Sequence, residues 1–236
     1  MKEKIEFSND IQEVVNTPQE IYDSFNEFMF SDDTKVFSKL IARTLIFDEV
    51  RDVPGDIVEC GVYKGSGLLT WLKLKKTLTP NAFKKVIGFD FFDSEELIST
   101  LSGHDKKTMS DMFENRKFKY KDYEKPLSDT IIKCGFNKSD FELVKGDVSK
   151  TTYNFVEQRP GFKISLLYLD LDLAQPTYDV LVNFWERMSK NGIIVFDEYA
   201  YHQWTESQGV DRFIKEYGLD IKMLHFNAPT AYIKKS

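Results

Sequence analysis

The sequence is poor in cysteine, with only Cys60 and Cys134 in 236 residues. Two cysteines cannot form a disulfide-stapled scaffold, and these two lie too far apart to be a zinc-binding pair. The three histidines are scattered as well, which excludes a His-rich metal cluster. This cysteine usage fits a reducing compartment best, so we expect a cytoplasmic protein.

Long apolar runs are also missing, and the mean hydropathy is -0.39. No uncharged stretch is long enough to span a bilayer, and no basic start leads into the apolar core of a signal peptide. The chain has no excess of positive charge either, because 32 Lys and Arg stand against 38 Asp and Glu, a net charge of -6. We therefore expect a soluble protein that binds neither membranes nor nucleic acid, since its surface would repel a phosphate backbone.

Hydrophobic residues are plentiful, at 42% of the chain with 20 Phe and 11 Tyr. This content predicts a packed globule, and 236 residues can form one α/β unit. We expect an N-terminal helical cover over residues 1–52 and a second domain over residues 53–236. An insertion at about residues 91–138, rich in Ser, Asp, Lys and aromatics, has the length of a lid.

The most informative stretch is residues 164–173, I-S-L-L-Y-L-D-L-D-L. Its nearly continuous apolar run is typical of a parallel strand buried on both faces. The run ends on Asp170 and Asp172. In open α/β sheets the ligand lies beyond the carboxyl ends of the strands, so both carboxylates are predicted at the functional edge.

A second buried strand is predicted over residues 192–199, and it too ends on acids, Asp197 and Glu198. Four carboxylates then meet at one edge, where oxygen ligands would select Mg²⁺ or Ca²⁺. The alternative is that these acids cap the helices that follow. The loop over residues 200–209 adds His202, a candidate second base or acceptor contact, with an ordinary surface histidine as the alternative.

A glycine-rich loop follows the first predicted strand, residues 56–60, and leads into a helix over residues 68–76. Strand, loop and helix in this order bring a backbone close to a nucleotide-like ligand. The spacing G-x-x-x-G-x-G matches neither the dinucleotide fingerprint nor the P-loop. A tight turn with glycines needed only for packing stays open as the alternative.

Two more predicted strands end in acids. Asp90 closes residues 85–90 and lies where Rossmann-like sheets place a carboxylate against ribose hydroxyls. Asp147 closes residues 141–147, where an adenine ring would be met. The tail, residues 221–226 and 230–234, predicts a β-hairpin at the edge of the sheet.

A helix is also predicted after residues 31–34, with Val36, Phe37, Leu40, Ile41 and Leu45 along its apolar side. We expect this side to pack into the core. An earlier helix around residues 18–28 is expected to pack as well, with a position over the ligand mouth or a dimer contact as the alternatives. The basic run over residues 116–121 is expected to be a solvated face, with attraction of an anionic substrate such as a nucleotide sugar as the alternative.

Four motifs together carry a family resemblance: P-G-D-I-V-E-C-G-V-Y-K-G-S-G, I-G-F-D-F-F, L-Y-L-D-L-D-L and G-I-I-V-F-D-E-Y. In this order and spacing the chain resembles the macrocin O-methyltransferases, over residues 53–218. The glycine loop with its preceding acid alone resembles motif I of S-adenosylmethionine-dependent methyltransferases. The family usually has Asp-Asp at Asp197-Glu198, and Glu-Ser-Thr at residues 175–177.

The resemblance implies a Rossmann-like class I methyltransferase sheet, mostly parallel with an antiparallel C-terminal hairpin and helices on both faces. It implies S-adenosylmethionine and Mg²⁺, or another hard divalent cation, as cofactors, and a hydroxylated small molecule, above all a sugar, as acceptor. The residues that resemble the family's site are Asp172 as the base; Glu59, Gly61, Gly65, Asp90 and Asp147 as cofactor contacts; and Asp170, Asp197 and Glu198 as metal ligands. Apart from the resemblance, we expect Ser66 of the glycine loop to contact the cofactor and His202 to be a second catalytic residue.

Other functions stay open on the sequence alone. A catechol-type O-methyltransferase would use the same metal chemistry on phenolic hydroxyls. A non-catalytic nucleotide-binding module would keep the fold without the reaction. A nicotinamide oxidoreductase is disfavoured, because the glycine spacing differs from the dinucleotide fingerprint. The N-terminal helices are a candidate surface for a homo-oligomer.

Overall fold

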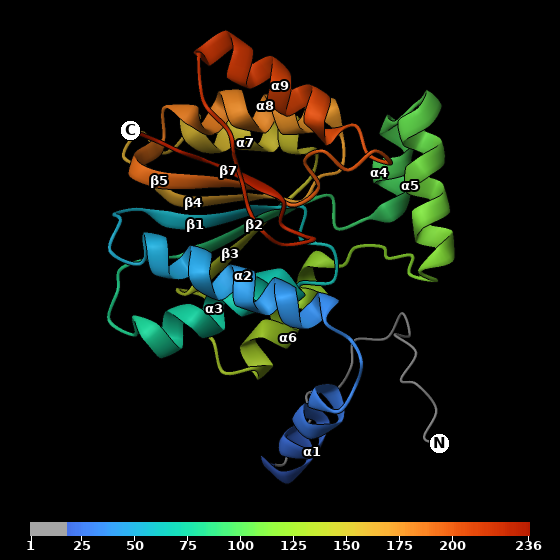
Figure 1. Cartoon of the computed structure of the whole chain (residues 1–236), viewed down its shortest axis with the longest axis vertical. Coiled ribbons are helices and arrows are strands. Elements are labelled where there is room, and N and C mark those ends of the chain that lie inside the picture. The colour runs from blue at the N-terminus through green and yellow to red at the C-terminus, as the bar shows by residue number, and fades with distance from the viewer. Residues whose placement is uncertain (1–17) are drawn as a thin grey trace.

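The protein is built on one seven-stranded sheet that lies between two layers of helices (Figure 1). The structure, a computed structural model, describes residues 18–236. The strands are β1 Asp56–Cys60, β2 Val86–Asp90, β3 Phe141–Lys145, β4 Ile164–Leu169, β5 Met188–Phe196, β6 Lys222–Met223 and β7 Ala231–Lys234. The helices are α1 Pro18–Met29, α2 Lys35–Val50, α3 Ser66–Leu78, α4 Ser94–Thr100, α5 Gly103–Asn115, α6 Glu124–Lys133, α7 Val148–Glu157, α8 Ala174–Trp185 and α9 Glu206–Tyr217.

The strand order is β3-β2-β1-β4-β5-β7-β6. The first five strands pair in parallel, and β7 pairs antiparallel with both β5 and β6. Helices α7, α8 and α9 cover one face, and α2, α3 and α6 cover the other (Figure 1). The predicted mostly parallel sheet with an antiparallel C-terminal hairpin is confirmed.

Strand β4 is buried over its whole length, as its apolar run predicts. Its side chains alternate between the two layers, because successive residues of a strand point to opposite faces. Leu167 and Leu169 pack into the core under α7 and α8, whereas Leu166 and Tyr168 pack into the core under α2 and α3. Both cores therefore hold β4 in place, and its carboxyl end is fixed in the middle of the sheet.

The N-terminal region differs from the prediction in which side of α2 faces the sheet. Of the predicted cover over residues 1–52, residues 1–17 lie outside the described structure, and the remainder forms α1 and α2. The predicted apolar side is exposed, at 46% for Leu40 and 56% for Leu45. The side that packs on the sheet includes the buried Phe47 and also the buried Arg43. The prediction of a buried Leu40 side was wrong, because α2 turns another apolar side, which includes Ile46 and Val50, into the core.

The insertion over residues 91–138 forms α4, α5 and α6. Met109, Phe113, Phe118 and Tyr120 build a small core of their own there, together with Leu173 from the loop after β4. Helices α4 and α5 lie beyond the end of the main sheet (Figure 1). No helix within residues 18–236 is both long and apolar enough to cross a membrane.

The buried Lys84 lies just before β2, at the amino-terminal edge of the sheet, and its side chain makes hydrogen bonds to two other segments. Its Nζ donates hydrogen bonds to the carbonyl oxygen of Val53, to that of Gly55 at 3.0 Å and to the Ser165 hydroxyl at 3.0 Å. We expect Lys84→Met to lower the free energy of unfolding by about 2 to 3 kcal/mol, because methionine fills the space but leaves these acceptors without a donor.

Urea unfolding measures this loss, and Lys85→Met is the matched control. Lys85 is half exposed and pairs with Glu142 at 3.6 Å. Such a pair contributes under about 1 kcal/mol. Equal losses in the two variants would contradict the structural role of Lys84.

Candidate functional site

The acids predicted from the strand ends lie at the carboxyl edge of β4 and β5. Asp170 and Asp172 follow β4, and Asp197 and Glu198 follow β5. Burial and the nearby Asp197 raise the pKa of Asp170 to about 6. Burial, Asp170 and Glu198 raise the pKa of Asp172 above its usual range. The carboxylates are thus close enough to oppose one another's ionisation, which favours a bound cation.

A cavity opens beside these acids, here called the inner cavity. Polar groups come from the strand ends and apolar side chains from the insertion, so its wall is mixed in character. Asp170, Asp172 and Asp90 are on the polar side. The other lining residues are Gly61, Tyr63, Phe91, Leu97, Met109, Met112, Phe113, Arg116, Tyr120, Val148, Leu171, Leu173 and Pro176. Such a cavity suits a ligand with both charged and apolar parts.

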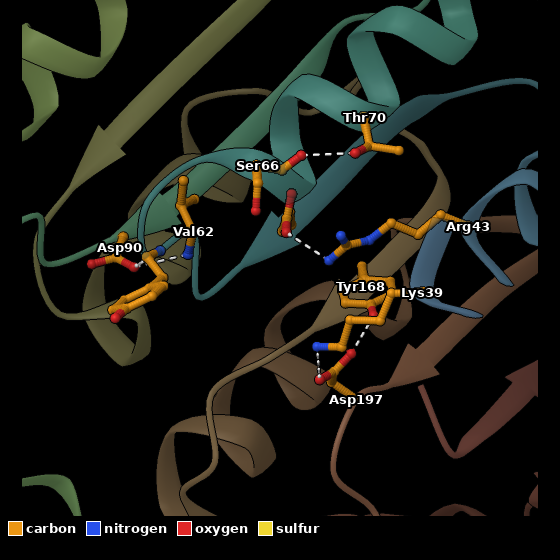
Figure 2. Close-up of polar contacts among 10 residues, drawn as sticks. Lys39, Arg43, Val62, Ser66, Thr70, Asp90, Tyr168 and Asp197 are labelled. Atoms are coloured by element: carbon orange, nitrogen blue, oxygen red, sulfur yellow. Dashed lines mark hydrogen bonds and ion pairs between the residues drawn. The ribbon is translucent and has the colours of Figure 1, made fainter. Parts of the chain in front are cut away.

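Asp90 anchors the glycine loop. Its Oδ2 accepts hydrogen bonds from the backbone N–H groups of Val62 at 2.8 Å and Tyr63 at 3.0 Å, as Figure 2 shows for Val62. Its Oδ1 accepts from the N–H of Phe92 at 2.8 Å and from the Tyr120 hydroxyl at 3.4 Å. Burial raises the pKa of Asp90, and these hydrogen bonds oppose the rise. Asp90 therefore holds the loop against the cavity that it also lines.

Two glycines of the glycine loop have positive φ angles and leave no room for a side chain. Gly61 has φ +89°, and a Cβ there would lie 1.9 Å from the carbonyl oxygen of Asp170. Gly65 has φ +90°, and its Cβ would meet Leu127 at 2.5 Å. Gly61 lines the inner cavity, whereas Gly65 and the exposed Ser66 at the start of α3 do not. Close packing thus accounts for both glycines, and Gly61 also brings backbone to the cavity.

Glu59 points away from the inner cavity toward α2. It is 1% exposed, and its Oε1 lies 3.7 Å from Nη2 of Arg43. The Arg43 guanidinium also lies over the rings of Tyr168 and Trp71, at 5.0 Å and 5.7 Å from their centroids. Burial raises the pKa of Glu59 to about 8, against the lowering by Arg43. This carboxylate is part of a buried ion pair.

Asp147 is the N-cap of α7, where its Oδ1 accepts a hydrogen bond from the N–H of Ser149 at 3.1 Å. It does not line the inner cavity, although the next residue, Val148, does. The side chain of Asp147 is therefore engaged in the cap, and the cavity wall here is Val148.

Lys39 of α2 reaches the acids, as Figure 2 shows. Its Nζ lies 2.8 Å from Oδ2 of Asp197, and the Tyr168 hydroxyl donates a hydrogen bond to the other oxygen, Oδ1. Asp197 is fully buried. Burial lowers the pKa of Lys39, but Asp170 and Asp197 outweigh it and raise this pKa above its usual value. Both oxygens of Asp197 therefore have donors from the protein.

Lys39 and Arg43 were missed in the sequence, yet a signal exists. Lys35, Lys39 and Arg43 recur every four residues, which places them along one side of a helix. This side, here called the basic side of α2, meets the acidic edge of the sheet.

A second cavity, here called the outer cavity, adjoins the first, because Met112 and Arg116 line both. Its remaining wall comes from Lys35, Asp111, Asn115, Glu198, Tyr201, Gln203 and Trp204. Burial, Asp197 and Asp170 raise the pKa of Glu198 to about 7, and Lys35 and Lys39 oppose this rise. The outer cavity therefore combines aromatic faces with charges of both signs.

His202 lines neither cavity. It is exposed and stacks on Tyr201, with ring centroids 5.9 Å apart. The structure thus separates His202 from the acids.

Glu206, in the first turn of α9, is a buried acid that the sequence analysis missed. Its Oε1 accepts a hydrogen bond from the N–H of Glu198 at 3.3 Å, and within residues 18–236 its Oε2 has no partner. Burial, Asp172 and Asp170 raise the pKa of Glu206 well above its usual range. An acidic residue in the first turn of a helix is common, because it interacts favourably with the helix dipole. Only the fold shows that Glu206 lies beside the other acids.

The acids fit a hard divalent cation in their donor chemistry. Asp170, Asp197 and Glu198 offer carboxylate oxygens, which Mg²⁺ prefers, and the buried Oε2 of Glu198 has no partner in the described chain. Over residues 18–236, however, no three acidic, His or Cys side chains converge closely enough to hold a metal ion. The positive charge next to Asp197 is the Lys39 ammonium.

Comparisons with known proteins point to one enzyme family. The family described as Macrocin-O-methyltransferase (TylF) matches residues 37–235. A curated relative is the 8-demethyl-8-(2,3-dimethoxy-alpha-L-rhamnosyl)-tetracenomycin-C 4'-O-methyltransferase of Streptomyces olivaceus, 24% identical over 151 residues. That match covers 63% of this chain and 54% of the relative, so the chain spans about half of the relative's length.

Solved structures share the fold. The apo structure of CalS11, described as a TDP-rhamnose 3'-O-methyltransferase of calicheamicin biosynthesis, has a TM-score of 0.68 at 23% identity, covering 93% of this chain and 88% of that one. The structure of the O-methyltransferase NovP has a TM-score of 0.70 at 17% identity, covering 84% and 80%. At these identities the likeness shows a common fold.

Proposed function

The chain belongs to the macrocin O-methyltransferase family, and from this premise we propose that it transfers a methyl group from S-adenosylmethionine to a hydroxyl of a sugar-bearing small molecule. The observation that carries the proposal is the contact between the two cavities. The inner one suits a ligand with charged and apolar parts, and the outer one meets it at Arg116 beside Glu198. A donor and an acceptor bound in the two cavities would meet at the acids.

In this proposal S-adenosylmethionine occupies the inner cavity. The backbone of Gly61 and the carboxylates of Asp170 and Asp172 would face its charged end, and Met109 and Phe113 would enclose its apolar part. Bound there, the cofactor supplies a methyl group on a positively charged sulfur. The apolar wall of the insertion excludes water from that sulfur, which is why we propose that the insertion acts as a lid.

Asp170, Asp197 and Glu198 would hold Mg²⁺, and the bound ion would lower the pKa of the acceptor hydroxyl. Asp172 is then the base that takes the hydroxyl proton. The hydroxyl oxygen would form a bond to the methyl carbon as the carbon–sulfur bond breaks, and the electron pair of that bond would stay on the sulfur, which becomes uncharged. Asp172 has the left-handed backbone angle φ 63° and lines the inner cavity, where its carboxylate would meet the acceptor hydroxyl.

The outer cavity is the proposed acceptor site. Tyr201 and Trp204 offer flat apolar faces, and Lys35 and Arg116 offer positive charge. A nucleotide-linked sugar combines a ring with a diphosphate and would use both kinds of contact. The CalS11 description names such a molecule, TDP-rhamnose.

A calorimetric titration with S-adenosylmethionine tests the donor half of the proposal, and an acceptor screen in Mg²⁺ or EDTA tests the other half. We expect a dissociation constant in the micromolar range, about -8 kcal/mol. Tyr201→Ala is the companion variant, at an exposed residue that lines the outer cavity but not the inner one. We expect it to raise the KM of a nucleotide-linked acceptor about tenfold while cofactor affinity stays unchanged, because stacking of a base on an aromatic ring contributes about 1 to 3 kcal/mol.

Absence of cofactor binding would overturn the proposal. Methylation of catechols but not of sugars would favour the catechol-type alternative, and cofactor binding without methylation of any acceptor would favour the non-catalytic module.

A further inference from the structure

The proposed metal site already contains a cation that belongs to the chain. Lys39 Nζ lies 2.8 Å from Oδ2 of Asp197, and its charge also acts on Asp170 and Glu198. These three acids are the proposed metal ligands. We infer that the Lys39 ammonium is a tethered competitor of the divalent cation, which occupies the acids in the metal-free protein and must leave when the metal binds.

The contacts of Asp197 support this inference. One of its oxygens faces Lys39 and the other accepts the Tyr168 hydroxyl, so the fully buried carboxylate has no free oxygen as long as Lys39 is in place. A divalent ion would therefore have to replace one of these two donors. Tyr168 is fully buried between the sheet and α2, whereas the Lys39 side chain is 28% exposed. The lysine is the donor that can leave.

Lys39 is also able to move without unfolding its helix. Its stem is a flexible four-carbon chain on α2, a helix that is anchored to the sheet by Phe47 and Val50 further along. The ammonium can turn toward solvent while the backbone stays in place, so metal binding requires a change of side-chain rotamer and no movement of the sheet.

The inference rests on the proposed metal site, and metal binding can be measured without methyl transfer. We expect Mg²⁺ titrated by calorimetry into Lys39→Met to bind at least about tenfold tighter than into the unaltered protein, the equivalent of removing one partly buried competing ion pair. Methionine keeps the length of the side chain and removes its charge.

Two further variants test whether Lys39 competes by occupying the acids or only by adding positive charge nearby. Lys35→Met removes a positive charge one turn earlier on α2, from a residue that lines the outer cavity without a hydrogen bond to Asp197. We expect its metal affinity to rise no more than about threefold, the effect of a screened surface charge. Lys39→Arg keeps the charge and should bind Mg²⁺ as weakly as the unaltered protein.

A second readout uses the unaltered protein. Acetylation of amines, followed by mass spectrometry, should modify Lys39 several times faster in saturating Mg²⁺ than in EDTA, because the displaced ammonium enters solvent. The exposed Lys35 should react at the same rate in both conditions.

Equal affinities of Lys39→Met and the unaltered protein, or no Mg²⁺ binding to any variant, would overturn the inference. A tenfold tighter Lys39→Met that methylates no acceptor would leave the inference standing and remove the proposed reaction. If the protein methylates an acceptor but Lys39→Met has unchanged metal affinity, the proposed reaction stands and the inference about Lys39 fails.

Discussion

An Asp172→Asn variant is expected to lose about three orders of magnitude in kcat, within the range of 10² to 10⁴ that general-base catalysis contributes. Asp172 lines the inner cavity and is held at φ 63°. Asparagine adopts this left-handed conformation as readily as aspartate, so the backbone is preserved and only the proton acceptor is lost. Initial rates at saturating cofactor and acceptor measure the effect.

The control for this variant is the binding of S-adenosylhomocysteine. This molecule keeps the charged amino-acid end that Asp170 and Asp172 would face, so its affinity shows how much of the cofactor site is kept. We expect it to weaken by no more than about tenfold, about 1.4 kcal/mol, which is far less than the loss in kcat. Asp179→Asn is the matched substitution, at a residue of α8 that accepts a hydrogen bond from Gln175 and lines neither cavity. Full activity in Asp172→Asn would remove this residue from the proposed mechanism.

The largest expected loss of stability follows from Arg43→Met. The guanidinium is buried between Glu59, Tyr168 and Trp71. Removal of one partner of a buried ion pair costs about 3 to 5 kcal/mol, because the remaining charge keeps its desolvation penalty. Urea unfolding at pH 9, above the folded pKa of Glu59, measures the loss, because the carboxylate of the unaltered protein is ionised there. In the double variant Arg43→Met, Glu59→Gln we expect part of it to return, since no uncompensated charge is left.

The pH dependence of this loss has a definite sign. The pKa of Glu59 is about 8 in the folded protein, above its ordinary value of 4.5. Between pH 4.5 and pH 8 the folded state therefore holds a proton that the unfolded state has released. The free energy of unfolding falls as the pH rises through this range. Arg43 lowers the pKa of Glu59, so the removal of Arg43 raises this pKa further. The free energy of unfolding then keeps falling up to a higher pH than in the unaltered protein. The deficit of Arg43→Met should therefore be larger at pH 9 than at pH 7. A deficit that shrinks toward pH 9 would contradict the pairing.

The sequence predicts most of the sheet and the positions of its acids, because the apolar runs of β4 and β5 end directly on them. It does not predict where Glu59 points. The strand β1 is buried on both faces, so no polar alternation tells which face a side chain takes. Only the packing of α2 shows that this carboxylate meets Arg43 and not the inner cavity.

The orientation of α2 was mispredicted for a related physical reason. Helix α2 has a second apolar side, with Ile46, Phe47 and Val50, and this side packs on the sheet together with Arg43, which pairs with Glu59. Hydrophobic periodicity shows where the apolar residues of a helix lie, but it gives no information about an ion pair whose partner lies on a distant strand.

The spacing of the basic side of α2 also limits how this helix can diverge. Arg43 reaches Glu59 at the end of β1, and Lys39 reaches Asp197 after β5, two strands further along the sheet. Four residues of helix rise about 6 Å and two strand spacings are about 9.6 Å, so the rise of α2 and the reach of the two long side chains together span β4. An insertion or deletion of one residue between them would turn the preceding part of the helix by about 100° and take Lys39 away from Asp197. The number of residues between Lys39 and Arg43 is therefore set by the spacing of their partners, Asp197 and Glu59.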